Sequence, residues 1–337
     1  MKTLLSIPAF RAVHLVPYVR FLRDVGTPVD RLLSKAKLPT MFEDDLQAYL
    51  PLLPTLDFLA SASHLDGIRD LGLATINHVD VSDLNQGFLA TLSATPTLQQ
   101  ALTAYCRMGS IENTNVVFWL EQDDALARAC AVLDAPGPQS ARRCAEWSQN
   151  MTLVAVIQAC AGPDWYPGEM AFTSNEPVTL SERQQFPNTR FLLGQRYTWV
   201  DLSRDLLAMP PRPLGVTITD PRYEPVLPGN FNDSLKRLLK PYLRDGYPHI
   251  ELAAEISGTS VRTLQRRLAA VGSSYSELLQ QARFEAARQL IADPDIKLID
   301  AAYHLGWSCP ATFSRAFRQF AGVSPSEFRN THKRVLH

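Results

Sequence analysis

The sequence predicts an α+β amino-terminal domain joined to an all-α carboxyl-terminal domain that contains two helix-turn-helix motifs. Two observations support this fold class. One pattern of small residue, glycine and amphipathic helix occurs twice within residues 252–315. Upstream, the apolar period changes from helical to alternating near residue 115 and returns to helical near residue 141. A chain of 337 residues has room for both parts, which we place at 1–208 and 231–334, with a proline-rich linker at 209–230.

The repeated pattern has the residues that a helix-turn-helix needs. A small residue lets two helices cross closely, a glycine four positions later accepts a left-handed turn, and a serine two positions after that is expected to cap the second helix. The small residue, glycine and serine are Ala254, Gly258 and Ser260 in the first copy and Ala302, Gly306 and Ser308 in the second. The offset between the copies is 48 residues up to the glycine and 49 at Arg266 and Arg315.

The second helix of each copy has one apolar and one polar face. At 100° per residue, the first presents Arg262, Gln265 and Arg266 opposite a stripe of Val261, Leu264 and Leu268. The second buries Phe313, Phe317 and Phe320, and it turns outward Ala311, Thr312, Arg315, Arg318 and Gln319, with Ser314 on the flank.

These outward side chains suit double-stranded DNA. The arginine fork matches guanine O6 and N7, glutamine matches adenine, and Ala311 or Thr312 can touch a thymine methyl. Arg315 is assigned to a base, and Arg318 to a phosphate. The alternative is that both faces are ordinary solvated surface, but the caps, glycines and polar faces repeat together.

One helix is expected to set the spacing of the two motifs. Ser274 and Glu277 fit a capping box, the segment 278–291 is helical in period, and 293–295 with its proline ends it. A rigid helix of this kind would place the two motifs in successive major grooves, roughly 34 Å apart.

Residues 231–333 resemble the DNA-binding domain of the AraC/XylS family of bacterial transcription regulators. The residues that carry the resemblance are 260–267, Arg283, Ala302 with Gly306-Trp307, 313–318, 322–325 and Phe328-Arg329. The resemblance implies base contacts by Arg262, Gln265 and Arg266 in the first motif and by Ala311, Ser314 and Arg315 in the second. Pro310 and Ala311 stand where some members have polar residues, so we expect the second motif to contribute less base specificity.

Charge and cysteine content fit this assignment. From Phe231 onward there are 15 basic and 10 acidic residues, whereas the rest of the chain has 18 and 24. Such an asymmetry is expected of a DNA-binding part joined to one that does not bind DNA. Five scattered cysteines without a C-x-x-C pair favour a reducing cytoplasm and no metal, although a thiol sensor stays open. We predict no secretory signal, no membrane segment and no cofactor.

The amino-terminal part mixes helices and strands. Helices are expected at 13–25, 29–36, 56–65, 98–108 and 141–161, a hairpin at 115–121 and 126–133, and short strands at 169–173 and 197–201. This part resembles the arabinose-binding-type domain of ornithine-utilisation regulators in Gly26, Leu32-Leu33 and the turn at 93–98. The resemblance implies a domain that binds a small effector, dimerises, or does both.

No catalytic residue is predicted. The sequence has no nucleophile elbow, phosphate-cradling glycine loop or H-E-x-x-H. His64 with Asp66, and His78 with Asp80, are close in sequence, but we interpret them as surface or capping residues. The aromatic residues Tyr105, Phe118, Trp119 and Trp147 belong either to an effector pocket or, as we favour, to the core.

The sequence therefore predicts a cytoplasmic, sequence-specific DNA-binding transcription regulator, an effector-controlled activator. Its expected partners are double-stranded DNA, a small-molecule effector of unknown identity, a second copy of the chain in a homodimer and, by resemblance, RNA polymerase. The alternative is an effector-independent dimeric repressor or architectural DNA-binding protein. An apolar pocket in the first domain favours effector control, whereas a filled core with an exposed apolar patch favours a pure dimeriser.

Overall fold

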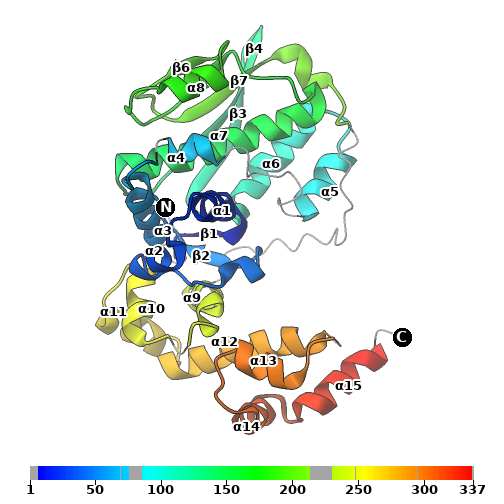
Figure 1. The fold of residues 1–337 in the computed structure, drawn as a ribbon. Helices are drawn as coiled ribbons and strands as arrows, with labels where there is room; N and C mark the ends of the chain where they lie inside the picture. Colours follow the sequence, from blue (N-terminus) through cyan, green and yellow to red (C-terminus); the bar gives the residue numbers. More distant parts are fainter. Residues whose placement is uncertain are drawn as a thin grey trace. The chain divides into compact units, whose positions relative to one another are not determined.

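The computed structural model describes residues 7–68, 70–75, 86–212, 230–246, 248–293 and 295–335 (Figure 1). Contacts divide the chain into two compact units. The α+β unit comprises Pro8–Ala36 and Leu52–Pro228, and the helical unit comprises Gly229–His337 together with Met1–Ile7 and Lys37–Pro51. Most of the predicted linker, residues 213–229, lies outside the described residues, as do His78 and Asp80, so the domain boundaries at 208 and 231 stay predictions.

The α+β unit is built on a mixed five-stranded sheet in the order β3-β4-β7-β5-β6. The strands are β3 (Val116–Gln122), β4 (Leu126–Leu133), β5 (Glu169–Ala171), β6 (Arg190–Leu192) and β7 (Thr198–Ser203). All pairs are antiparallel except β5 with β6. The predicted hairpin is confirmed: β3 and β4 pair in register from Val116–Leu133 onward, and the Asp123 carboxylate closes the turn by accepting from the amides of Ala125 and Leu126.

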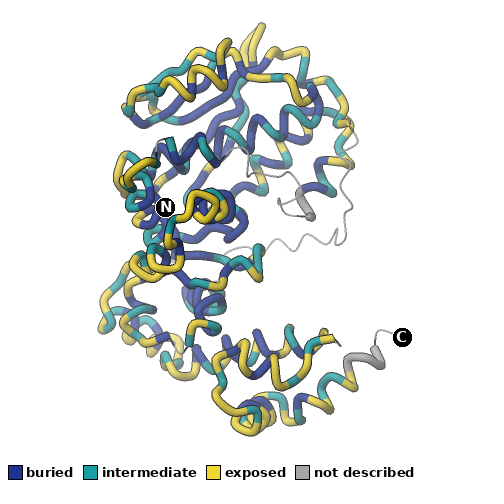
Figure 2. The backbone as a smooth tube through the Cα atoms, viewed as in Figure 1, coloured by how far each residue is buried: buried dark blue, intermediate teal, exposed yellow. Residues whose placement is uncertain are grey.

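The long helix α7 (Gln139–Ala161) packs along this sheet against β4 and β7 (Figure 1). Around it lie α1 (Val16–Asp24), α2 (Val29–Lys35), α3 (Leu52–Ser63), α4 (Leu71–Ala74), α5 (Gln86–Ala94), α6 (Leu98–Glu112) and α8 (Leu180–Gln185). Figure 2 shows the buried residues concentrated along the strands and α7. Trp147, Phe172 and Phe186 are fully buried there, which places the core between this helix and the sheet.

The predicted first helix at 13–25 is divided. A 3-10 turn at Ala12–His14 follows the short strand β1 (Ala9–Arg11), and α1 begins only at Val16. Pro17 stands in the first turn of α1, where its missing amide hydrogen leaves no bond unmade. The predicted opening of α6 is confirmed, because the Thr97 hydroxyl accepts from the amide of Gln100.

The helical unit consists of α9 (Phe231–Leu239), α10 (Ile250–Ile256), α11 (Val261–Ala269), α12 (Tyr275–Ala292), α13 (Leu298–His304), α14 (Pro310–Ala321) and α15 (Pro325–Val335). The capping box that opens α12 is confirmed, since Ser274 and Glu277 bond each other's backbone amides. With 18 residues, α12 is about 27 Å long. It lies between the pair α10–α11 and the pair α13–α14 in the chain, and it contacts α9, α13, α14 and α15.

A segment from the amino-terminal third, Lys37–Pro51, also belongs to the helical unit. It contains the strand β2 (Tyr49–Pro51), which contacts α9. The Tyr242 hydroxyl donates to the carbonyl of Lys37 at 2.7 Å. The Asp245 carboxylate accepts from both the amide and the hydroxyl of Thr40, each at 2.7 Å. The sequence did not predict this pairing, because each contact joins residues about two hundred positions apart.

Charge pairs reinforce the attachment of the 37–51 segment. Lys240 lies 3.0 Å from Asp45, and Arg244 bonds Asp44. Since these groups are largely exposed, each pair contributes less than about 1 kcal/mol. The apolar anchor is Phe42, whose side chain is almost completely buried. Burial of that ring, more than the ion pairs, therefore stabilises the segment.

The two motif glycines provide a test of this packing. Gly258 and Gly306 both have a positive φ, +62° and +70°, so alanine at either position costs about 1–2 kcal/mol in backbone strain. A Cβ at Gly258 would meet open space, whereas one at Gly306 would stand 2.6 Å from the carbonyl oxygen of Leu243. We expect Gly306→Ala to lower the unfolding temperature of the helical unit clearly more than Gly258→Ala. Equal shifts in calorimetry would show that the backbone at Leu243 does not constrain this turn.

Candidate DNA-binding surface and ligand pocket

The helix pair α10–α11 forms the first predicted helix-turn-helix. Ala253 and Ala254 are buried where α10 contacts α11. The amide of Thr259 donates to the carbonyl of Ala254 at 2.9 Å, across the left-handed Gly258. The Ser260 hydroxyl then caps α11 by accepting from the amide of Thr263 at 3.2 Å. Each local feature expected from the sequence is present in this motif.

The outward face of α11 is polar and free of partners. Arg262, Gln265 and Arg266 are all exposed, and none has a side-chain hydrogen bond or ion pair within the described part of the chain. Leu264 and Leu268 are fully buried on the opposite side. The predicted division into two faces is therefore present, with Val261 only half-buried at its edge.

Neighbouring Arg267 has a different position. It is half-buried, and its guanidinium lies 4.9 Å from the centre of the Phe231 ring. This cation–π contact attaches α11 to α9. Arg267 therefore packs against the rest of the helical unit, whereas Arg262 and Arg266 face outward.

The pair α13–α14 forms the second motif, and here one local prediction was wrong. The residue that precedes α14 is Cys309, not Ser308, and no side chain caps the helix. Pro310 occupies the first helical position, where a proline fits without loss of a hydrogen bond. The turn after Gly306 is one residue longer than in the first motif, in agreement with the change in offset from 48 to 49. The backbone amides of Thr312 and Ala311 near the Cys309 sulfur lower the pKa of its thiol.

The outward face of α14 contains the remaining predicted contact residues. All five are exposed: Ala311, Thr312, Ser314, Arg315 and Arg318. No hydrogen bond or ion pair of the Ser314, Arg315 or Arg318 side chain is found among the described residues. Phe313 and Phe317 are buried as expected. Phe320 is 42% exposed, which corrects its assignment to the buried stripe. Its ring stacks on Phe284 at 5.5 Å and is covered on that side only, near the end of the helix.

Arg283 of α12 holds the turn of the second motif. Its side chain is 7% exposed, and its Nη2 donates to the carbonyls of Leu305 and Gly306 at 3.0 and 3.1 Å. The guanidinium also lies 3.9 Å from the centre of the Trp307 ring. These carbonyls have no helical partner because the chain turns there, so the arginine satisfies them. One buried cation thus joins the connecting helix to the left-handed turn.

Arg329 of α15 has a matching role on the other side of the connection. It donates to the carbonyl of Ile291 at 2.9 Å and to that of Ile296 at 2.6 Å, which fixes the loop between α12 and α13. Both arginines had been identified only through the resemblance of their surrounding motifs. Their hydrogen bonds now assign them to the architecture of the DNA-binding surface and not to its outward face.

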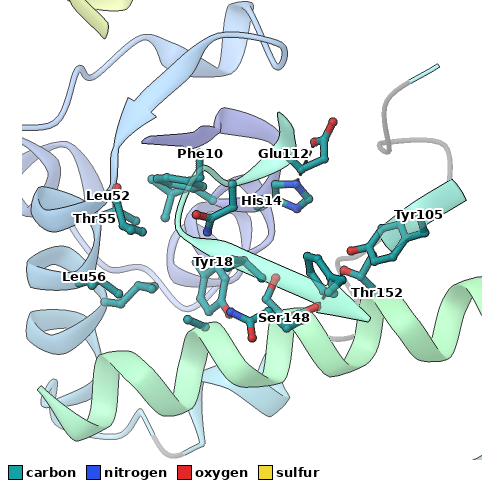
Figure 3. A pocket seen from close by; sticks show the side chains of 17 residues that line it. Phe10, His14, Tyr18, Leu52, Thr55, Leu56, Tyr105, Glu112, Ser148 and Thr152 are labelled. Atoms are coloured by element: carbon teal, nitrogen blue, oxygen red, sulfur yellow. Dashed lines mark hydrogen bonds and ion pairs between the residues drawn. The ribbon is translucent and has the colours of Figure 1, made fainter. Parts of the chain in front are cut away.

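The α+β unit contains an apolar pocket of about 70 Å³ between α1, α3, β3 and α7 (Figure 3). Phe10, Leu52, Leu56 and Phe118 supply apolar wall. One water molecule needs about 10–15 Å³ of such a cavity volume, so the pocket holds roughly five to seven water-sized non-hydrogen atoms.

Polar groups stand at two places on the pocket wall. His14 Nε2 lies 3.1 Å from a carboxylate oxygen of Glu112 (Figure 3). Gln149 is 8% exposed, and its Oε1 has no hydrogen-bond partner among the described residues. A buried amide oxygen without a partner is costly, so a ligand that donates a hydrogen bond there would be favoured.

The four candidate aromatic residues separate into two groups. Tyr105 and Phe118 line the pocket, with ring centres 4.8 Å apart. Trp119 lies against Tyr197 at 4.8 Å and donates to Glu121, away from the pocket. Trp147 packs in the core against Phe172. Core packing is therefore the role of two of them, and pocket lining that of the other two.

Other chemistry considered from the sequence is not assembled in the described residues. His64 Nδ1 lies 2.6 Å from the carbonyl of Ala60 in the helix that precedes it, and among these residues no bond joins it to Asp66. No group of three or more metal-ligating side chains occurs in this part of the chain. No helix in it is long and apolar enough to cross a membrane. Burial raises the thiol pKa of Cys106 and Cys160 to about 11 and that of Cys130 and Cys144 to about 12, which disfavours thiolate chemistry at all four.

Comparison with known proteins identifies a domain family and several relatives. Residues 253–331 match the family model of a helix-turn-helix domain. The chain is 25% identical to the ornithine utilization regulator of Pseudomonas aeruginosa, across 94% of this chain and 96% of that protein. It is 32% identical to the transcriptional activator NphR of a Rhodococcus species, across 30% of each chain. The crystal structure of the transcriptional regulator CdpR from Pseudomonas aeruginosa aligns with 94% of this chain and 98% of its own, with 20% identity and a TM-score of 0.43.

The role of Arg283 can be tested by Arg283→Leu, which keeps an apolar stem but leaves two carbonyls unpaired. We expect the free energy of unfolding of the helical unit to fall by about 2–3 kcal/mol. Arg288→Leu on the same helix is the matched control, because Arg288 is exposed and its guanidinium makes only ring contacts, 5.5 Å from the centre of Phe328 and 5.9 Å from that of Phe284. The control should stay within about 1 kcal/mol of the parent in urea unfolding. If both variants lowered the free energy of unfolding equally, the hydrogen bonds of Arg283 to the turn would not stabilise the unit specially.

Proposed function

The chain is an AraC/XylS-type helix-turn-helix transcription regulator and not an enzyme, and we propose that it activates transcription under the control of a small molecule. The observation that carries the proposal is the pair of outward faces on α11 and α14, which present unpaired arginine, glutamine and hydroxyl groups. Such groups match the hydrogen-bonding edges of bases in the major groove. The name of the relative NphR, a transcriptional activator, supports the sign of regulation.

We assign the two faces different weights in recognition. Arg262, Gln265 and Arg266 form a dense polar triad that reads bases directly. On α14, Ala311 and Thr312 contact thymine methyls, while Ser314 and Arg315 supply the polar base contacts. Arg318 lies one turn further along and binds a phosphate. Since the second face has fewer bidentate groups, the first motif sets most of the sequence preference.

The pocket in the α+β unit is the proposed effector site. It is mostly apolar, with a few polar groups that can fix the orientation of a ligand, as small-molecule sites commonly are. Its wall includes Leu52, Thr55 and Leu56 of α3. Residue 52 follows directly on the 37–51 segment, which is bonded to the helical unit through Thr40 and Tyr242. A ligand that shifts α3 therefore pulls on a segment attached beside the first motif.

Two further parts of the proposal follow from this arrangement. A regulator in which each protomer reads two groove segments gains specificity from a homodimer on two half-sites. Activation requires contact with RNA polymerase, which we propose on the family resemblance. The protein would then act in the cytoplasm, where its DNA target is.

Arg266 and Arg318 give a matched pair for the assignment of contacts. Arg266→Ala should cost about 1–3 kcal/mol on the preferred site and relax the preference at one base pair. Arg318→Ala should weaken binding to all sequences alike and reduce the log–log salt slope by about one. Binding-site selection and titrations at several salt concentrations measure both effects. An unchanged preference for Arg266→Ala, or a sequence-selective loss for Arg318→Ala, would contradict the assignment.

Effector control is tested by footprinting the full-length protein on DNA upstream of its own and neighbouring genes, with and without a panel of metabolites. We expect one metabolite to change the footprint. Leu56→Trp, which fills the pocket, should keep the footprint and lose the response to that metabolite. Val117→Trp, at a position that is 59% exposed, is the control that should keep both. A footprint indifferent to every metabolite would favour the effector-independent alternative.

A further inference from the structure

A second cavity in the α+β unit differs in chemistry from the apolar pocket. It has a volume of about 220 Å³ and lies between α4, the first turns of α7 and the residues that lead into α8. Charged and hydroxyl side chains dominate its wall, and they include Asp70, Ser140, Arg143, Glu176 and Glu182. The proposed regulation makes no use of this cavity, so its composition calls for a separate explanation.

Arg143 offers an unused donor to this space. The residue is 6% exposed, and its Nη2 donates to Glu182 at 2.9 Å. The other terminal nitrogen, Nη1, is buried and has no hydrogen-bond acceptor among the described residues. Glu182 accepts from Nη2 of Arg143, and its oxygens also accept from Trp147 Nε1 and from the amide of Thr179, so it leaves Nη1 without a partner in this arrangement. A buried guanidinium nitrogen without an acceptor is strongly disfavoured unless a ligand provides one.

A second unused donor stands beside it. Ser140 precedes Arg143 by three residues on α7, so the two side chains lie on the same face of the helix. The Ser140 hydroxyl is buried and likewise has no partner in the described part of the chain. Helix α7 begins at Gln139 after Pro138, with no side-chain cap on its free amides. A guanidinium, a hydroxyl and a helix N-terminus on one wall together favour a carboxylate or another small anion.

Negative groups on the same cavity determine which anion fits. Asp70 and Glu176 line it, and neither has an ion-pair partner among the described residues. Asp70 also has a left-handed backbone, with φ +54°, an uncommon conformation for a residue with a side chain. A doubly charged anion such as phosphate would be repelled by these carboxylates. A molecule that adds an ammonium group would pair with them.

We propose that this cavity binds a small zwitterion of the amino-acid class. Its carboxylate accepts hydrogen bonds from Arg143 Nη1 and the Ser140 hydroxyl, and its ammonium group faces Asp70 and Glu176. Leu71 and Trp147 supply the apolar wall that the carbon chain contacts. The cavity volume accommodates roughly fifteen non-hydrogen atoms on the scale used for water, which is enough for an amino acid of ordinary size.

The test uses four five-carbon probes with the full-length protein: L-norvaline and 5-aminopentanoate, which have both charges, pentanoate, which has only the carboxylate, and pentylamine, which has only the ammonium. Calorimetric titration measures their affinities. At least one zwitterion should bind saturably and at least tenfold more tightly than both singly charged probes. Failure of both zwitterions to bind, or pentanoate binding as tightly as they do, would overturn the proposal.

Variants locate the binding. Arg143→Leu leaves the carboxylate of Glu182 without its cation and can unfold the unit, so Ser140→Ala is the primary variant. Ser140 has no partner to lose, and its removal should leave the unfolding temperature unchanged while weakening the zwitterion about tenfold. Ser148→Ala, on the same helix but on the wall of the apolar pocket, should bind the probe normally. Equal affinity of the two variants would exclude this cavity as the site. DNA footprints are measured separately, so failure here leaves the proposed regulation untouched.

Discussion

The buried guanidinium of Arg283 is the interaction on which the DNA-binding surface depends. The second motif turns through Gly306, and this turn leaves two carbonyls with no helical partner. Arg283 satisfies both from the middle of α12 and covers the Trp307 ring at the same time. Helix α12 is a single helix capped at its start by Ser274. The hydrogen bonds of Arg283 therefore fix the turn of the second motif to a rigid element. Without Arg283, the turn before α14 would lose the hydrogen bonds that join it to α12.

Features determined by neighbours in sequence could be predicted, and several were found as expected. The glycine turns, the Ser260 cap, the Ser274–Glu277 box and the hairpin at Asp123 each depend on residues within a few positions of one another. The outward residues of α11 followed from helical period alone. The exception, Cys309 in place of Ser308 as the N-cap, arose where a single inserted residue moved the register.

Features determined by distant residues could not be predicted in the same way. The attachment of residues 37–51 to the helical unit joins positions about two hundred apart, through Tyr242 and Asp245. The Arg143–Glu182 pair and the two cavities likewise arise only when α7 meets segments from elsewhere in the chain. The periodicity of a sequence gives no information about contacts between segments that are far apart in the chain. Phe320 is a milder case, since it lies on the apolar stripe but its side chain is 42% exposed.

The central claim is that two DNA-reading helices are held at a fixed spacing by one helix. The most direct test is the affinity of the full-length protein for its selected site before and after insertion of about five base pairs, half a DNA turn, between the two groove segments that one protomer protects. The account predicts that affinity drops toward the non-specific level and that one of the two protected segments is lost. Full affinity with both segments still protected would contradict it, because the two helices would then move independently.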